Sequence, residues 1–191
     1  MFHCGAALAA SKILVLGDSL SAAYGIAEKR GWVALLSERL AKERPDYSVA
    51  NASISGETTS GGLARIGRAL SQHKPAVVII ALGANDGLRG LPVAEMKKNL
   101  GAIAKAAQGA GARVVITGMR MPPNYGPDYA SAFDAAFADV AKAHRATLAP
   151  FLLDGMADKP ELFQPDRLHP TEAAQPILLD NIWKALRPLL K

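Results

Sequence analysis

Short apolar segments alternate along this chain with longer amphipathic segments, and this alternation is the feature that most restricts its fold. The apolar segments span residues 13–16, 47–51, 76–82, 113–117 and about 147–150. The amphipathic segments span residues 31–43, 58–72, 92–108, about 129–143 and about 171–189. Buried strands that alternate with helices predict a parallel sheet with helices packed on both faces. We therefore expect a doubly wound α/β domain with a five-stranded sheet.

Residues with chemically useful side chains or backbone groups follow several of the predicted strands. Ser19 follows the first strand, Gly56 the second and Asn85 the third, while Asp166 and His169 follow the fifth. In an open parallel sheet, ligands bind beyond the carboxyl ends of the strands, near the point where the strand order reverses. The sequence therefore predicts that these five residues meet at one edge of the sheet.

Ser19, His169 and Asp166 have the residue types of a nucleophile, a general base and an orienting carboxylate. A serine hydroxyl becomes a nucleophile when an imidazole takes its proton and a third group fixes that imidazole. Asp166 precedes His169 by three residues, which allows its carboxylate to accept a hydrogen bond from one ring nitrogen while the other faces Ser19. The alternative for Ser19 is a simple helix cap, and an isolated histidine is more often structural.

Gly56 and Asn85 are candidate donors to a negatively charged oxygen in the transition state. A glycine at a strand-to-helix turn can present its backbone N–H without an obstructing side chain, and an asparagine amide can donate beside it. The backbone N–H of Ser19 would be the remaining donor of such an oxyanion hole. The alternatives are an ordinary tight turn at Gly56 and an Asx-turn at Asn85, with Asp86 holding that loop in place.

The blocks around these residues, taken together, resemble the GDSL or SGNH hydrolase superfamily, which is named after its Ser, Gly, Asn and His. The likeness covers nearly the whole chain after Ala10 and is most specific in residues 17–25, 51–65, 85–90, 123–126 and 169–176. It is nearest to the bacterial thioesterases, lysophospholipases and arylesterases of this superfamily. One departure is Ala84, where these enzymes tend to carry glycine.

The resemblance implies a three-layer, flavodoxin-like α/β/α fold and a serine hydrolase that cleaves esters and thioesters of acyl chains through an acyl-enzyme. It assigns the nucleophile to Ser19, the base to His169 and the orienting carboxylate to Asp166. It assigns the oxyanion hole to the N–H groups of Ser19 and Gly56 and to the side chain of Asn85. It also implies a periplasmic or secreted enzyme that needs no cofactor.

Apolar residues predicted to lie around the same edge of the sheet are candidates for binding the acyl chain, because enzyme pockets are mostly apolar. They are Leu88, Leu91, Met121, Pro122 and Tyr125. The alternative is that they only pack the loops. A carbohydrate O-deacetylase and a catalytically silent lipid-binding domain on the same fold remain the competing functions.

Composition excludes several other classes of protein. The net charge of +5 comes from scattered lysines and arginines, so nucleic-acid binding is not expected. No apolar run is long enough to span a membrane, and no cluster of histidines or cysteines has the spacing of a metal site. We expect residues 1–10 to be a signal-peptide remnant or a disordered leader, and residues 11–191 to form a single, monomeric domain.

Overall fold

The structure is a computed structural model, and it describes residues 10–191. Most of the expected leader, including Ala7, Leu8 and Ala9, lies outside the described residues. Within residues 10–191, none of the helices is both long and apolar enough to cross a membrane.

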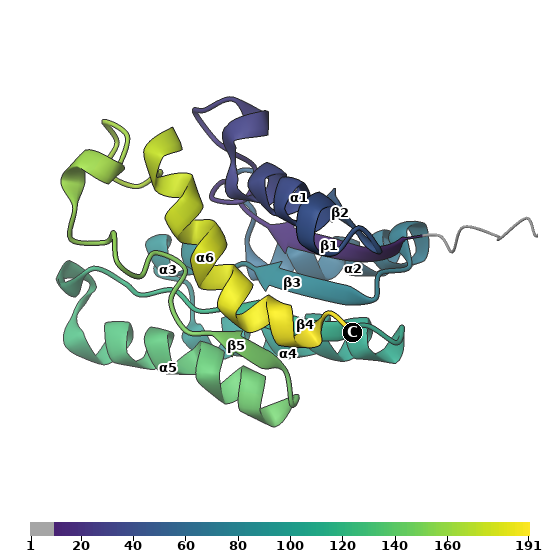
Figure 1. Cartoon of the computed structure of the whole chain (residues 1–191). Coiled ribbons are helices and arrows are strands. Elements are labelled where there is room, and N and C mark those ends of the chain that lie inside the picture. The colour runs from purple at the N-terminus through teal and green to yellow at the C-terminus, as the bar shows by residue number, and fades with distance from the viewer. Residues whose placement is uncertain (1–9) are drawn as a thin grey trace, which may run out of the picture.

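The core of the molecule is a parallel sheet of five strands in the order β2-β1-β3-β4-β5 (Figure 1). The strands are β1 (Ser11–Gly17), β2 (Tyr47–Asn51), β3 (Val77–Ala81), β4 (Arg113–Thr117) and β5 (Thr147–Ala149). Every residue of β3 is buried, as expected for a central strand with helices on both faces. The strand order reverses between β1 and β3, which are directly paired. The expected fold class is therefore confirmed.

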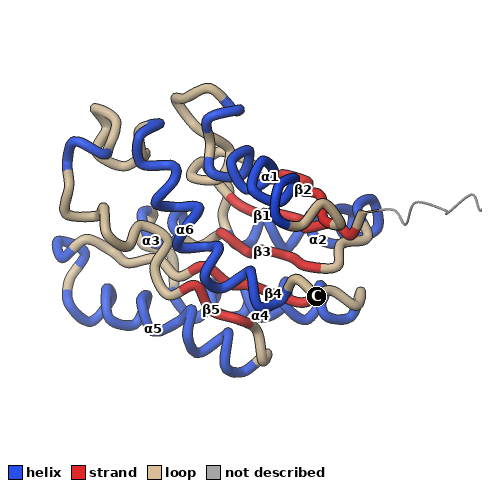
Figure 2. Tube along the Cα trace, in the orientation of Figure 1, coloured by secondary structure: helices blue, strands red, loops and turns tan. Residues whose placement is uncertain are grey.

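Helices cover both faces of the sheet (Figure 2). One face carries α1 (Trp32–Glu43) and α6 (Gln175–Leu186), which pack against each other. The other face carries α2 (Thr59–His73), α4 (Val93–Gly109) and α5 (Pro127–Ala143), with α4 between its two neighbours. A short helix, α3 (Ala84–Leu88), follows β3 and was not expected from the sequence. The predicted long helices and strands otherwise begin and end within a few residues of the observed ones.

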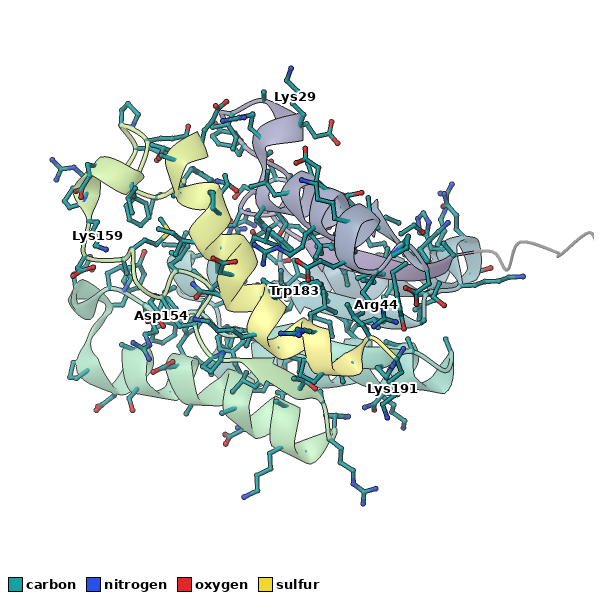
Figure 3. The ribbon with its side chains drawn as sticks, viewed as in Figure 1. Lys29, Arg44, Asp154, Lys159, Trp183 and Lys191 are labelled. Atoms are coloured by element: carbon teal, nitrogen blue, oxygen red, sulfur yellow. The ribbon has the colours of Figure 1, made fainter. Side chains whose placement is uncertain are left out.

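Residues 190 and 191 are hydrogen-bonded at the edge of the sheet where the strands begin. Tyr47 donates a hydrogen bond from its hydroxyl to the Lys191 carbonyl at 3.1 Å, and Arg44 donates to the Leu190 carbonyl. Figure 3 shows Arg44 and Lys191 lying near each other at this edge. The opposite edge, where β1 and β3 end, is left for the loops that carry the candidate residues.

Candidate active site

The loop that carries Ser19 leaves β1 through a glycine that the packing requires. A Cβ atom on Gly17 would lie 2.7 Å from the Ser21 hydroxyl oxygen and 2.8 Å from that of Ser53. Next to it, the Asp18 carboxylate accepts a hydrogen bond from the Leu20 backbone N–H at 3.0 Å. The tight turn that results places Ser19 directly after the buried strand, partly open to solvent.

The structure brings Ser19, His169 and Asp166 together although 150 residues separate the first two. The Ser19 hydroxyl oxygen lies 2.9 Å from His169 Nε2, and His169 Nδ1 lies 2.7 Å from Asp166 Oδ2. Both contacts are hydrogen bonds in one continuous chain. With Nδ1 protonated and donating to Asp166, Nε2 is left to accept the Ser19 proton, which is the tautomer that a general base needs.

Asp166 is ionised and firmly held at neutral pH. Its Oδ1 accepts backbone N–H hydrogen bonds from His169 at 3.0 Å and from Leu168 at 2.9 Å. These two bonds and the contact with the His169 ring lower the pKa of Asp166 to about 2. Arg167 adopts a positive φ of 57°, a conformation that non-glycine residues rarely take and that is concentrated at functional sites.

Gly56 and Asn85 lie beside this chain of hydrogen bonds. Gly56 has a φ of +78°, which favours glycine, in the loop between β2 and α2. Asn85 lies in the first turn of α3, and its Nδ2 donates to the Glu57 carbonyl at 3.1 Å. A second contact of Nδ2, with Asp18 Oδ2, is longer at 3.5 Å. One hydrogen of the Asn85 amide is therefore used in the hydrogen bond to Glu57, while the second makes only the long contact with Asp18.

A partly buried ion pair supports the loop that contains Gly56. Arg65 Nε donates to Glu57 Oε2 at 2.8 Å, and other guanidinium nitrogens donate to the carbonyls of Ala52 and Gly17. One arginine on α2 therefore ties the ends of β1 and β2 to the loop between β2 and α2. These bonds were not foreseen from the sequence.

Two further carboxyl groups are buried behind the site. Asp86 is 3 % exposed and accepts hydrogen bonds from the Thr59 hydroxyl at 2.5 Å and from the Thr59 backbone N–H at 2.9 Å. It thereby fastens α3 to the start of α2, as the alternative for Asp86 anticipated. Asp18 is 2 % exposed, and burial, with a smaller contribution from the charge of Asp86, raises its pKa to about 7.

A cavity of about 590 Å³ opens at this point and brings the predicted residues together. Its lining contains Ser19, Gly56, Asn85 and His169. Of the five candidates for acyl binding, Leu88, Met121 and Pro122 line it, whereas Leu91 and Tyr125 do not. The Tyr125 hydroxyl instead donates to the Leu88 carbonyl at 3.1 Å, and the Leu91 carbonyl accepts from Tyr129 at 2.8 Å. Tyr125 therefore supports the Leu88 part of the cavity wall, whereas Leu91 is an exposed residue outside the cavity.

The sequence interpretation missed the rest of the apolar lining. These residues are Leu20, Tyr24, Ala84, Met119, Phe151, Leu153, Ala157, Phe163 and Leu168. Phe151 and Leu153 follow the fifth strand, so the rule that placed the other residues at the carboxyl ends of strands could have found them. Tyr24 and Phe163 carry no comparable signal, because the turns that bring them to the cavity are irregular.

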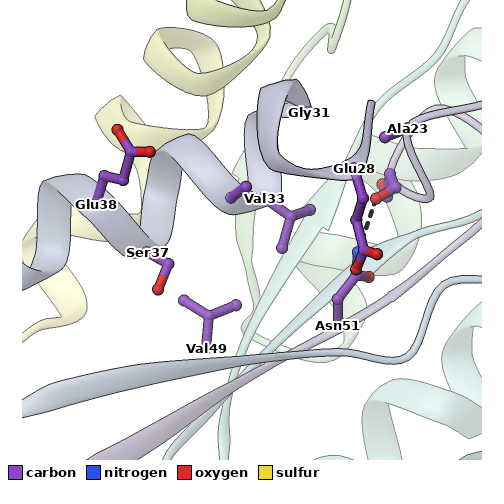
Figure 4. Close-up of a pocket in the computed structure, with 10 residues that line it drawn as sticks. Ala23, Glu28, Gly31, Val33, Ser37, Glu38, Val49 and Asn51 are labelled. Atoms are coloured by element: carbon purple, nitrogen blue, oxygen red, sulfur yellow. Dashed lines mark hydrogen bonds between the residues drawn. The ribbon is translucent and has the colours of Figure 1, made fainter. Parts of the chain in front are cut away.

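Another cavity, of about 450 Å³, lies between α1, β2 and the loop after Ser19 (Figure 4). Glu28, Glu38 and Asn51 are among its lining residues, and Asn51 Nδ2 donates to the Ser21 carbonyl at 2.9 Å. Its lining, which the structure describes in full, contains no histidine. Among residues 10–191, no three His, Cys, Asp or Glu side chains form a group that could hold a metal ion.

Residues 15–176 match the GDSL-like lipase/acylhydrolase family. Esterase TesA of Pseudomonas aeruginosa is 50 % identical over 182 residues, which cover 95 % of this chain and 90 % of that protein. Thioesterase 1/protease 1/lysophospholipase L1 of Escherichia coli is 41 % identical over 184 residues, covering 96 % and 87 % of the two chains. The crystal structure of the psychrotrophic esterase EstA from Pseudoalteromonas sp., inhibited by monoethylphosphonate, has a TM-score of 0.90 at 43 % identity and covers 94 % of this chain and 98 % of that one.

Proposed function

This chain belongs to the GDSL-like lipase/acylhydrolase family and hydrolyses esters, and we propose that Ser19, His169 and Asp166 are its catalytic residues. The observation that carries the proposal is the 2.9 Å contact between the Ser19 hydroxyl and His169 Nε2, in a cavity large enough for a substrate. His169 is oriented in turn by an aspartate that stays ionised. The substrates are small-molecule esters.

In the first step, Ser19 Oγ attacks the carbonyl carbon of the ester while His169 Nε2 takes its proton. The new C–O bond pushes the carbonyl electrons onto oxygen, and the resulting imidazolium is stabilised by Asp166. Collapse of the tetrahedral intermediate breaks the bond to the leaving alcohol or thiol. The imidazolium returns its proton to that leaving group, and the acyl group stays on Ser19.

The negative oxygen of the intermediate is stabilised by the N–H groups of Ser19 and Gly56 and by the Asn85 side chain. The hydrogen bond from Asn85 to the Glu57 carbonyl fixes the amide before substrate arrives. Asn85 Nδ2 lies 3.5 Å from Asp18 Oδ2, so its other hydrogen is only weakly bonded there and is available to the developing oxyanion. Donors that are already in place cost no reorganisation during the reaction, which is the main source of their effect.

In the second step, water attacks the acyl-enzyme with the help of the same histidine. His169 Nε2 removes a proton from the water, the oxygen bonds to the acyl carbon, and the bond to Ser19 breaks. Ser19 recovers its proton from the imidazolium, and the carboxylic acid leaves. The cycle uses no group outside the chain except water.

The apolar lining of the cavity supports acyl chains longer than acetyl as substrates, carried on oxygen or on sulfur. Phe151, Leu153 and Phe163 line the cavity together with Leu88 and come from a different part of the chain. Neither tryptophan is placed to stack on a sugar ring, because Trp32 is fully buried and the ring of Trp183 lies under the Arg39 guanidinium. This arrangement favours an acyl esterase over a carbohydrate deacetylase.

The test compares the parent enzyme, Ser19→Ala and the control Ser131→Ala, an exposed serine of α5. Rates are measured on p-nitrophenyl esters from acetyl to palmitoyl and on an acyl-CoA, and Ser19 is labelled with a fluorophosphonate. We expect Ser19→Ala to lose more than a thousandfold in kcat and to stay unlabelled, while Ser131→Ala matches the parent. Activity of Ser19→Ala within tenfold of the parent would refute the assignment, and activity confined to acetyl esters would refute the acyl-chain preference.

We also infer that the enzyme is exported to the periplasm or secreted and acts as a monomer. The support for export is the resemblance to exported hydrolases and the small-residue segment that ends at Ala10. Fractionation of cells for esterase activity tests the compartment, and light scattering of the purified protein tests the monomer. Activity found only in the cytoplasm, or a dimer mass, would contradict the respective inference.

A further inference from the structure

The base of the proposed mechanism lies in a segment that has little regular structure. Between β5 and α6, the chain forms only two short 3-10 helices and an isolated bridge between Phe163 and Pro170. Backbone ladders therefore do little to fix His169. Its position relative to Ser19 has to be set by individual contacts.

Gln164 makes four of those contacts. Its backbone N–H donates to the His169 carbonyl at 2.7 Å, and its own carbonyl accepts from the Arg167 N–H at 2.8 Å. Its side-chain Nε2 donates to the Tyr24 carbonyl at 2.8 Å and to the Pro170 carbonyl at 3.0 Å. Both amide hydrogens are used, and Gln164 is 140 residues from one acceptor, Tyr24, but only 6 from the other, Pro170.

Tyr24, whose carbonyl accepts one of the two hydrogen bonds from the Gln164 side chain, belongs to the loop that carries Ser19. Its backbone N–H donates to the Ser19 carbonyl at 3.2 Å, and its ring lies against the His169 imidazole with centroids 4.4 Å apart. The approach is close, because a Cβ atom on the next residue, Gly25, would lie 2.1 Å from Gln164 Oε1. The side chain of Gln164 thus spans the junction between the loop that carries Ser19 and the segment that carries His169.

We propose that Gln164 is a positioning residue that holds His169 at hydrogen-bonding distance from Ser19. The proposal rests on the proposed function of these two residues. Gln164 touches no reacting atom, so its effect passes through the distance between Ser19 Oγ and His169 Nε2. A displacement of about 1 Å at a reacting group can cost about a hundredfold in rate.

The test uses Gln164→Met, which keeps the length of the side chain without its donors, and Gln164→Ala. Gln108→Ala is the matched control, because Gln108 Nε2 donates to a backbone carbonyl, that of His144, outside the cavity. We expect both Gln164 variants to lose about 10- to 100-fold in kcat on a p-nitrophenyl ester, with KM changed less than threefold. Labelling of Ser19 by a fluorophosphonate should slow by a similar factor, because it needs the same serine and base. Gln108→Ala should match the parent in both assays.

A merely structural role would lower the melting temperature and leave kcat per folded molecule unchanged. Rates are therefore normalised to the folded fraction from circular dichroism. If Gln164→Ala does not fold, the kcat of Gln164→Met alone distinguishes a positioning role from a structural one. A kcat for folded Gln164→Met within threefold of the parent would overturn the proposal. If that happens while Ser19→Ala is inactive, the positioning role alone fails; if Ser19→Ala is active, the proposed function fails.

Discussion

The buried carboxyl group of Asp18 should make the parent protein less stable as pH rises. Replacing Asp18 by asparagine should remove this dependence on pH. Asp18 lies behind the nucleophile with 2 % of its surface exposed, and its pKa is raised from 3.8 to about 7. The folded state therefore binds the proton more tightly than the unfolded state does. The resulting stabilisation is complete below about pH 4 and is lost as pH rises through about 7.

The size of the effect follows from the two pKa values. Each tenfold difference in proton affinity corresponds to about 1.4 kcal/mol, so raising the pKa from 3.8 to about 7 corresponds to about 4 kcal/mol. Between these values, the free energy of unfolding should fall by about 1.4 kcal/mol for each pH unit because of this group. Domains of this size are stable by about 5–15 kcal/mol in total, so a change of this size is easily measured. Asparagine stays neutral at every pH and can still accept from the Leu20 N–H.

The assay is urea unfolding followed by circular dichroism, at pH 4, 5, 6, 7 and 8. The measured quantity is the free energy of unfolding of Asp18→Asn minus that of the parent, which cancels the titration of the groups that they share. We expect this difference to grow by about 4 kcal/mol from pH 4 to pH 8 in favour of the variant. The exposed control, Asp158→Asn, should follow the parent throughout. A difference that does not change with pH would refute the reasoning, whatever its constant value.

Two other substitutions test the site and the core separately. Asn85→Ala removes one proposed oxyanion donor and should lower kcat by about 100- to 1000-fold with little change in KM; steady-state kinetics check this, and a loss below fivefold would contradict the role. Phe133→Ala empties the space of a fully buried ring that packs edge-on against Phe137 and should lower the free energy of unfolding by about 3–5 kcal/mol in urea. A loss below 1 kcal/mol would show that the core closes over the gap.

The regular part of the fold could be predicted because its signals are local. The strands Tyr47–Asn51 and Arg113–Thr117 have the ends that the sequence predicts. Arg113–Thr117 is buried after its first residue, as expected for a strand inside a parallel sheet, whereas Tyr47–Asn51 is the half-buried edge strand. The rule that sites lie at the carboxyl ends of strands then placed Ser19, Gly56 and Asn85 on one edge. The structure brings them to one cavity with His169.

The missing part depends on contacts between distant segments that leave no periodic pattern. The helix Ala84–Leu88 is too short to show a periodic pattern. It is held by a hydrogen bond that its own Asp86 accepts from Thr59 of another helix. The lining residues Tyr24 and Phe163 lie in turns whose course is set by bonds such as that from Gln164 to the Tyr24 carbonyl. Such bonds are specific to one three-dimensional arrangement, and a single sequence does not reveal them.

The nucleophile and the proposed oxyanion donors come from the first 85 residues of the chain, whereas the base and its carboxylate lie beyond residue 165. A nascent polypeptide that has left the ribosome only as far as α5 would carry the serine without a group to deprotonate it. Cleavage of esters should therefore begin only after nearly the whole polypeptide has been synthesised and its final quarter has docked onto the first. Hydrolysis of a chromogenic ester can for that reason report the last stage of folding, in which the segment that carries His169 docks beside Ser19.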